Sequence, residues 1–343
     1  MECITIKDVA RVCGVGVSTV SRAINNHPDI NPETKEMIMQ VIKENNYVPN
    51  NSARNLKRSD ARAIAILIKG ISNQFFNSMI KVFEEEIQKK KYSLVLQHVD
   101  AWQDETEVAL ELEKEKRLRG IIFLGGIASH SQEQLKKIPV PFVLSTVSLL
   151  GKEYKNDYSF VSVDDVKESC RMTEHLISQG HEKIALLCSY KEDVSIGALR
   201  LTGYKKALEA HNIPVDERRI RHMDPELDSY SMESGYRMTK ALLEEGVDCT
   251  AIFAISDSLA IGAVRALIDA GKRVPMDISV AGFDGTEMAA YYNPSITTIR
   301  QPAETMARET IKLLFDNIKK KTNVQQLIFE GELVPGESVK KIN

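Results

Sequence analysis

The chain has little of what marks a secreted, disulfide-bonded or membrane protein. Its 343 residues include five cysteines, which are scattered and form no C-x-x-C pair. A disulfide framework or a zinc site is therefore not expected. No apolar run approaches the ~20 residues that a membrane span needs. The N-terminus has no basic stretch followed by an apolar one, as a signal peptide requires. These absences predict a cytoplasmic protein with reduced thiols.

The chain also lacks the short motifs of common catalytic sites. It contains no G-x-G-x-x-G, G-x-x-x-x-G-K-[ST], G-x-S-x-G or H-E-x-x-H sequence. The seven histidines are dispersed, and His181 lies in a predicted turn, where we interpret it as structural. Without a phosphate cradle, an activated nucleophile or a metal-ligand cluster, we expect no enzyme activity, no cofactor and no metal.

Charge gives no direct sign of a nucleic-acid partner. Forty-five Lys and Arg residues face 48 Asp and Glu residues, for a net charge of −3. Residues 1–58 carry eight basic and six acidic residues, and the remainder carries 37 and 42. The first segment is thus weakly basic and the rest acidic, which predicts moderate non-specific attraction to phosphates at most.

Residues 1–48 carry helix signals and no β-rich run. Thr5 followed by Asp8 resembles a capping box that opens a helix to about Cys13. A second short helix is predicted from Val17 to Asn25, after a turn that contains two glycines. Asn31-Pro32-Glu33 provides an N-cap, a first-position proline and a first-turn acid for a third helix, which ends near Asn45. Two short helices and a packing helix match a helix-turn-helix DNA reader, although such modules often serve packing alone.

From residue 61 onward, apolar strand-like runs alternate with amphipathic helices. Strands that are apolar throughout and separated by helices indicate parallel sheets covered on both faces. Eight such runs favour two doubly wound subdomains. The predicted strands are Ile64–Ile68, Leu94–Leu96, Ile121–Leu124, Phe142–Leu144, Phe160–Val163, Ile184–Cys188, Ala251–Ile255 and Ser279–Gly282, and the predicted helices include Phe76–Lys90, Val166–Gln179, Leu199–His211 and Ser258–Ala270.

Ligands of open α/β sheets bind beyond the carboxyl ends of the strands, and the residues there suit a polyhydroxylated molecule. Carboxylates and amides can bond hydroxyl groups, while aromatic rings stack on apolar faces. Asp257 could instead only cap the next helix, one of the two phenylalanines could belong to the core, and Trp102 could be a surface residue. The strand-end candidates are Ser72, Asn73, Phe75, Phe76, Asp100, Trp102, Asp164, Ser256, Asp257 and Asp284.

Specific residues of the N-terminal segment resemble the headpiece of the lactose-repressor (LacI/GalR) family. They are Ile4-Thr5-Ile6-Lys7-Asp8-Val9-Ala10, Gly14-Val15, Thr19-Val20-Ser21-Arg22, Asn25, Tyr47-Val48-Pro49-Asn50 and Ala53-Arg54-Asn55-Leu56. The resemblance implies a recognition helix, Val17 to Asn25, in the major groove, with Val17, Ser18 and Arg22 touching base edges. It implies phosphate contacts for Thr19, Ser21, Asn25, Thr34, Tyr47 and Asn50. Gly16 departs from the serine common in the family and supplies no side-chain contact.

Residues 49–60 resemble the family's hinge helix. Ala53 and Leu56 match the residues that enter the minor groove, where an apolar wedge opens a base step. Leu56 could alternatively anchor the linker to the core, but its neighbours are polar. A helix of about two turns is marginal in water, because nucleation is unfavourable. We therefore expect the hinge helix to order only in a dimer on DNA, which would couple dimer geometry to DNA affinity.

The resemblance extends along the core. It implies the fold of periplasmic sugar-binding proteins and effector contacts by Arg200, Asp257 and Asp284; Ser256 departs from a common asparagine, and Lys69-Gly70 departs from a common Pro-Asp. The expected architecture is an all-α helix-turn-helix headpiece (1–48), a hinge helix (49–60) and an α/β core (61–343). The core would comprise an N-subdomain (about 61–162 and 293–324) and a C-subdomain (about 163–292 and 325–343).

The function expected from these features is that of a homodimeric, sequence-specific transcriptional regulator, in particular a repressor. It would bind a palindromic operator in double-stranded DNA under the control of a small effector, a sugar or sugar derivative. A solute-binding module leaves residues 1–58 unexplained, and an α/β enzyme acting on sugars or nucleosides lacks a catalytic constellation. These two remain the alternatives.

Overall fold

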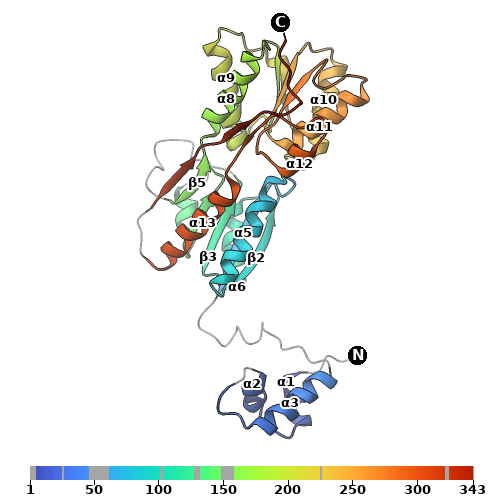
Figure 1. Cartoon of the computed structure of the whole chain (residues 1–343). Helices are drawn as coiled ribbons and strands as arrows, with labels where there is room; N and C mark the ends of the chain where they lie inside the picture. The colour runs from blue at the N-terminus through green and yellow to red at the C-terminus, as the bar shows by residue number, and fades with distance from the viewer. Residues whose placement is uncertain are drawn as a thin grey trace. The chain divides into compact units, whose positions relative to one another are not determined.

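The computed structural model describes residues 5–24, 27–45, 62–100, 103–126, 132–147, 158–224, 226–320 and 324–342. The chain divides into two compact units, residues 1–61 and 62–343 (Figure 1). We call them the headpiece and the core. The predicted hinge helix and the predicted site residues Asn25, Tyr47, Asn50, Ala53, Leu56 and Trp102 lie outside the described residues.

The headpiece contains three helices whose starts follow the predicted capping signals. Helix α1 (Ile6–Val12) is preceded by Thr5, whose backbone N–H donates to the Asp8 carboxylate at 3.0 Å. Helix α2 spans Val17–Ile24. Helix α3 (Pro32–Glu44) begins after Asn31, whose Oδ1 accepts from the backbone N–H groups of Glu33 and Thr34 at 2.8 and 3.2 Å. Local side-chain chemistry therefore fixes where α1 and α3 begin.

A small cluster of apolar side chains holds the three helices together. Val20 and Ala23 of α2 are fully buried. Ile38 of α3 is also fully buried, and Val41 and Ile42 of the same helix pack against the cluster. The other buried members are Val9 and Ala10 of α1.

The first sheet of the core is parallel and has six strands, in the order β11-β5-β4-β3-β1-β2. Strand β3 is buried at every position, as expected for an inner strand covered on both faces. In β1, Ile64, Ile66 and Ile68 face one apolar cluster, whereas Ala65 and Leu67 face another. The strands are β1 (Ala63–Lys69), β2 (Ser93–Val99), β3 (Gly120–Leu124), β4 (Phe142–Ser145), β5 (Phe160–Val163) and β11 (Gln326–Phe329).

The second sheet is also parallel and has four strands, in the order β7-β6-β8-β9. We call the two halves of the core the N-lobe, which holds the six-stranded sheet, and the C-lobe, which holds this one. The strands are β6 (Ile184–Cys188), β7 (Ile220–His222), β8 (Ala251–Ala254) and β9 (Ser279–Ala281). The core helices are α5 (Phe75–Lys89), α6 (Glu105–Lys116), α7 (Gln132–Lys136), α8 (Asp165–Ser178), α9 (Ile196–Ala210), α10 (Met232–Glu244), α11 (Asp257–Asp269), α12 (Glu287–Tyr291) and α13 (Ala303–Ile318), with a short 3-10 turn at Glu217–Arg219.

The C-terminal segment differs from the expected division of the core. Residues 325–343 were assigned to the C-subdomain, but β11 pairs with β5 in the six-stranded sheet of the N-lobe. The chain then returns through β12 (Glu332–Val334), which pairs antiparallel with β10 (Thr298–Arg300). Such a four-residue excursion carries no periodic signal long enough to show which sheet it joins, so sequence patterning misplaced it.

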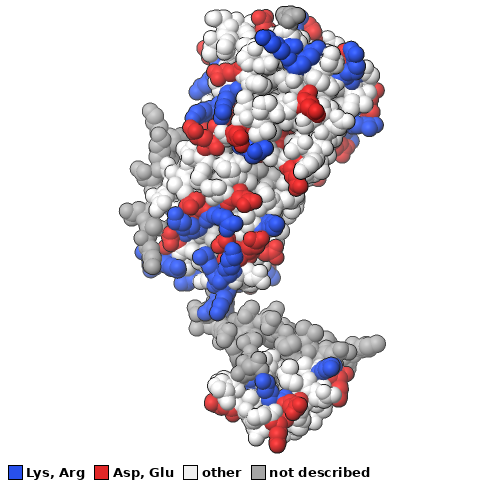
Figure 2. Space-filling view, viewed as in Figure 1, with Lys and Arg blue, Asp and Glu red and all other residues white. Residues whose placement is uncertain are grey.

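Charged side chains on the surface of the core are not segregated by sign. Acidic and basic side chains are interspersed over the face seen in Figure 2. Within the described parts of the chain, no helix is long and apolar enough to cross a membrane.

Candidate functional site

Helix α2 divides into a buried and an exposed face. Val20 and Ala23 point into the headpiece cluster, whereas Val17, Ser18 and Arg22 are exposed to solvent. Val17 is 41% exposed, although it is apolar. The predicted base-reading residues thus lie together on the free face of one helix. Of the predicted phosphate contacts, Thr19, Ser21 and Thr34 are half-buried.

The core contains a cavity of about 380 Å³ between its two lobes. Residues that follow β1 and β3 line one wall, and residues that follow β6 and β7 line the other. All four strands end here at their carboxyl ends, where open α/β sheets bind ligands. The volume lies near the lower end of the ~300–1,000 Å³ found for small-molecule pockets. The lining includes Lys69, Gly70, Asn73, Phe76, Gly125, Gly126, Ser189, Tyr190, Glu192, Asp193, Ser195, His222, Met223 and Tyr230.

Some predicted effector contacts do not line this cavity. Asp100 lies at the end of the edge strand β2, is exposed, and approaches His98 at 3.7 Å. Asp164 is exposed and caps α8, because its Oδ1 accepts from the Lys167 backbone N–H at 3.0 Å. The neighbouring Asp165, which the sequence argument did not select, is the buried acid at this strand end. Phe76 and Asn73 do line the cavity.

A buried polar network lies behind the cavity and centres on Arg200, which is 2% exposed. Its Nε donates to Asp165 Oδ1 at 2.9 Å, and its Nη1 donates to the Ile255 carbonyl and lies 3.6 Å from Asp284 Oδ1. Its guanidinium carbon stands 3.7 Å from the centre of the Phe283 ring, in cation–π contact. The arginine thus ties β5–α8, β8 and β9 together from α9.

Asp284 joins the two lobes within this network. Asn73 of the N-lobe donates to its Oδ2 at 3.1 Å, and Gln301 donates to its Oδ1 at 2.8 Å. A cavity of about 10 Å³, lined by Asn73, Asp165, Arg200 and Asp284 among others, adjoins these groups. That is close to the space that one water or one ligand hydroxyl occupies. The oxygen Asp165 Oδ2 is buried there with no protein partner among the described residues.

Asp257 is neither a helix cap nor exposed to the cavity. Ser256 is the N-cap of α11 and accepts from the Leu259 backbone N–H at 3.2 Å. The fully buried Asp257 carboxylate accepts from the Thr298 hydroxyl at 2.7 Å and from the Thr286 backbone N–H at 2.6 Å. Asp257, at the start of α11, therefore holds Thr286, which follows β9, and Thr298, the first residue of β10, by hydrogen bonds. Neither role that the sequence suggested for it is seen here.

The buried acids have altered proton affinities. Burial raises the pKa of Asp284 to about 7, although the Arg200 guanidinium opposes the shift. Burial raises the pKa of Asp257 to about 6, against the hydrogen bonds from Thr298 and Thr286. Burial also raises the pKa of Asp165, with Arg200 again opposing. Asp284 therefore changes its charge near neutral pH.

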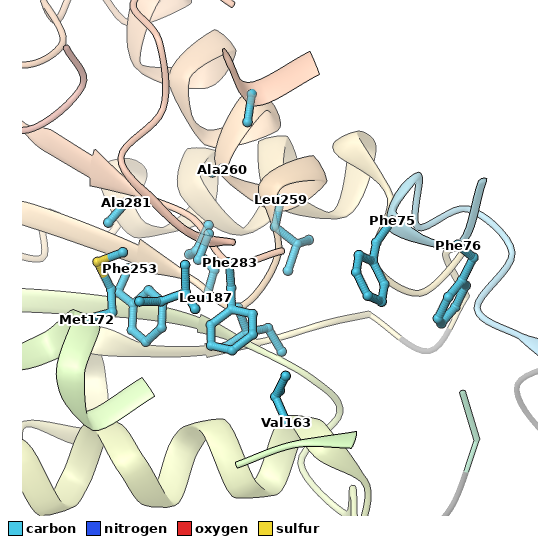
Figure 3. Close-up of a cluster of buried hydrophobic side chains, with 14 of the residues drawn as sticks. Phe75, Phe76, Val163, Met172, Leu187, Phe253, Leu259, Ala260, Ala281 and Phe283 are labelled. Atoms are coloured by element: carbon cyan, nitrogen blue, oxygen red, sulfur yellow. The ribbon is translucent and has the colours of Figure 1, made fainter. Parts of the chain in front are cut away.

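Phe75 and Phe76 separate into two environments. Their ring centres are 5.7 Å apart at the start of α5, and both side chains are 5% exposed. Figure 3 shows them on the N-lobe segment, away from the group of C-lobe side chains that surrounds Phe283. Both rings border the small polar cavity, but only Phe76 also lines the main cavity, whereas Phe75 also lines an outer groove. Phe76 is thus the ring placed to contact a ligand in the main cavity.

Sequence reasoning missed most of the cavity's second wall. The loop Ser189–Ser195 follows β6, a strand that was correctly predicted, so the strand-end rule could have found it. The strand-end rule could not have identified His222 and Tyr230. Strand β7 has only three residues, too few to show a strand pattern, and Tyr230 lies eight residues beyond it.

A helix-turn-helix unit joined to a two-lobed core with an interlobe cavity defines the class of ligand-responsive DNA-binding regulators. Residues 5–50 match the family model described as bacterial regulatory proteins, lacI family, and residues 173–339 match that of a periplasmic binding protein-like domain. The chain belongs to the lacI family of bacterial transcriptional regulators.

Known relatives resemble the chain over nearly its whole length. It is 42% identical over 339 residues to the HTH-type transcriptional regulator MalR of Clostridium butyricum, covering 97% of this chain and 98% of the relative. A solved complex of the transcriptional regulator CelR with cellobiose superposes with a TM-score of 0.71 at 29% identity, over 98% of this chain and 99% of that one. The lac repressor dimer bound to operator and an anti-inducer superposes with a TM-score of 0.73 at 26% identity, over 99% and 100%. These relatives are regulators rather than enzymes.

Proposed function

We propose that this protein is a homodimeric repressor that binds a palindromic operator and changes its affinity when a sugar occupies the cavity between its lobes. The observation that supports this most is the 380 Å³ cavity itself, because residues from both sheets line it. A molecule bound there touches both lobes and can favour one arrangement of them over another. The CelR complex with cellobiose gives a precedent in a structurally similar protein.

The exposed face of α2 supports sequence-specific reading of DNA. Arg22 can donate two hydrogen bonds to guanine O6 and N7, Ser18 can donate or accept, and Val17 can contact a thymine methyl group. Thr19, Ser21, Asn25, Thr34, Tyr47 and Asn50 would fix the register through phosphates. Two copies related by a two-fold axis would require inverted half-sites.

Communication between cavity and DNA would pass through residues 49–60. Ala53 and Leu56 would enter the minor groove from this segment, and their insertion requires both copies of the chain in register. A ligand that alters the N-lobes of the dimer would thereby change the free energy of DNA binding.

An electrophoretic mobility shift experiment on the full chain tests the proposal. The chain would be offered a pool of random duplexes at moderate salt, and the bound fraction would be sequenced. We expect enrichment of an inverted repeat and a change in its affinity on adding ribose, glucose, cellobiose or maltose. DNA binding that does not depend on the DNA sequence would contradict the proposal that this protein is a sequence-specific regulator. An operator affinity that none of the sugars changes would contradict the proposal that its effector is a sugar.

Thermal unfolding of the full chain with the same sugars is the complementary measurement. A ligand that binds the native state raises the melting temperature by mass action. A sugar that shifts operator affinity should also raise the melting temperature of the core.

A further inference from the structure

Lys69 is a cationic donor in the N-lobe wall of the cavity. It is the last residue of β1, and its side chain is 10% exposed. Its Nζ donates to the Gln103 carbonyl at 2.8 Å and to Glu105 Oε2 at 2.9 Å. An ammonium group has three N–H donors. Among the described residues Nζ has no third acceptor, so one donor is available to a ligand in the cavity that Lys69 lines.

The surrounding backbone makes room for the carboxylate that holds Lys69. Glu105 is the first residue of α6 and is almost completely buried. A Cβ atom on Gly126 would lie 2.4 Å from Glu105 Oε1, and one on Gly125 would lie 2.7 Å from the Lys69 carbonyl oxygen. Both glycines also have positive φ values, 70° for Gly125 and 114° for Gly126. The two glycines after β3 thus permit a buried ion pair, an arrangement that costs desolvation and adds little stability by itself.

Asp193 is the corresponding acceptor in the C-lobe wall. Its Oδ1 accepts from the Ser195 backbone N–H at 2.8 Å, in the loop between β6 and α9. Its Oδ2 is buried and has no hydrogen-bond partner among the described residues. Gly197 leaves the space that this oxygen occupies, because a Cβ there would lie 2.5 Å from it. A buried acceptor without a partner is costly, so a ligand that donates to it gains affinity.

We propose that Lys69 and Asp193 form a donor–acceptor pair across the cavity that selects a neutral polyhydroxylated ligand and rejects its phosphorylated form. A hydroxyl group both donates and accepts, so it can satisfy the donor-only ammonium and the acceptor-only carboxylate. The Lys69 charge is compensated by Glu105, whereas Asp193 Oδ2 has no cationic partner in the described part of the chain. The side chains of Lys191 and Glu192 at the rim are exposed and opposite in charge. A ligand phosphate would therefore meet an uncompensated carboxylate.

This inference rests on the proposed function and is tested with the full chain by isothermal titration calorimetry. The probes are ribose, glucose, cellobiose and maltose, with ribose 5-phosphate and glucose 6-phosphate as anionic counterparts. The variants are Asp193→Asn and the double variant Lys69→Met with Glu105→Gln, which leaves no unpaired buried charge. Asp248→Asn and the double variant Lys205→Met with Glu217→Gln are the matched controls, since they change the same charges at exposed positions that do not line the cavity.

We expect at least one neutral sugar to bind the wild-type chain. The phosphorylated form of that sugar should bind at least about tenfold more weakly. Asp193→Asn and the Lys69 double variant should each weaken the neutral sugar by about tenfold to a hundredfold, as for hydrogen bonds to charged groups. Asp193→Asn should also narrow the preference for the neutral over the phosphorylated sugar. The surface controls should change sugar affinity by less than about twofold. Melting temperature without ligand and operator affinity, measured for each variant, verify that the fold is intact.

Two kinds of failure are distinguishable. If a sugar binds but both cavity variants retain its affinity within twofold, or if the phosphate binds as tightly, the donor–acceptor pair is wrong and the proposed function stands. If no neutral sugar binds the wild-type chain, the proposed function fails and the pair fails with it.

Discussion

The headpiece and the core handle their charged side chains in opposite ways. In the headpiece, Arg22 is exposed on a helix whose other face packs against a few apolar residues. In the core, Arg200 is buried and bonded to Asp165 and the Ile255 carbonyl. The N–H donors of Arg22 are exposed and available to a binding partner, whereas Arg200 donates its hydrogen bonds to groups within the protein. A matching residue type in a family motif therefore says little about whether a side chain binds a ligand or holds the fold.

The substitution Arg200→Ala is expected to have the largest effect on stability of the changes that test this contrast. Removing one partner of a buried ion pair leaves an uncompensated carboxylate, so the core should lose about 3–5 kcal/mol of unfolding free energy. Urea denaturation of the full chain measures the loss. Arg218→Ala is the control on the same lobe, because Arg218 is 79% exposed and pairs with Asp216 at the surface. A similar loss of unfolding free energy for Arg200→Ala and Arg218→Ala would show that the buried arginine stabilises the core no more than an exposed one.

Arg22→Ala should leave stability unchanged and weaken operator binding. Loss of a bidentate contact to guanine costs about 1–3 kcal/mol and relaxes the preference at one base pair. Mobility shifts with operators substituted at each position measure both effects. Equal weakening on every sequence would assign Arg22 to phosphate binding instead.

Asp284→Asn should remove a pH dependence near neutrality from the stability of the core. The folded pKa of about 7 lies above the ~3.9 of an unfolded aspartate, so the native state binds more protons between these values. Its contribution to stability is complete below about pH 4 and is lost as the pH rises through 7. Wild-type stability should thus fall from pH 5 to pH 8 by at least about 1 kcal/mol more than that of the variant. Urea denaturation of both proteins at the two pH values measures the difference. Parallel profiles would show that Asp284 does not titrate there.

The smallest expected effect concerns the headpiece cap. Asn31→Ala removes the acceptor for the Glu33 and Thr34 backbone N–H groups and should destabilise α3 by about 1 kcal/mol. Hydrogen exchange of the α3 amides in the full chain measures this change. Amides in α9 of the core serve as the internal reference, and their protection should stay constant. Faster exchange in both helices would indicate a global effect.

Sequence patterning predicted the framework of the protein well. Strand β6 and strand β5 have the predicted bounds, and the starts of α1 and α3 follow from capping residues beside them. The buried and exposed faces of α2 also follow from local spacing, because helical periodicity places Val20 and Ala23 opposite Ser18 and Arg22. Such features depend on residues within a few positions of one another.

The polar residues of the core were predicted less well. Asp164 and Asp165 are neighbours in sequence, yet one caps α8 at the surface and the other bonds buried Arg200. Asp257 was assigned by its place after a strand, but its partners Thr286 and Thr298 are 29 and 41 residues away. The partners of a polar side chain depend on chain segments that meet only in the folded structure.

Short-range spacing in the sequence was enough to predict the starts of α1 and α3 and the alternating strands and helices of the core, and it also accounts for the exposed face of α2. The pairing of β11 with the first sheet, and the bonding of Arg200 and Asp257 within the protein, could be seen only in the folded chain. Folding also brought Lys69 and Asp193 to one cavity. The physical reason is that burial and hydrogen-bond partnership are properties of segments far apart in the chain, whose meeting is set by the packing of whole sheets and helices.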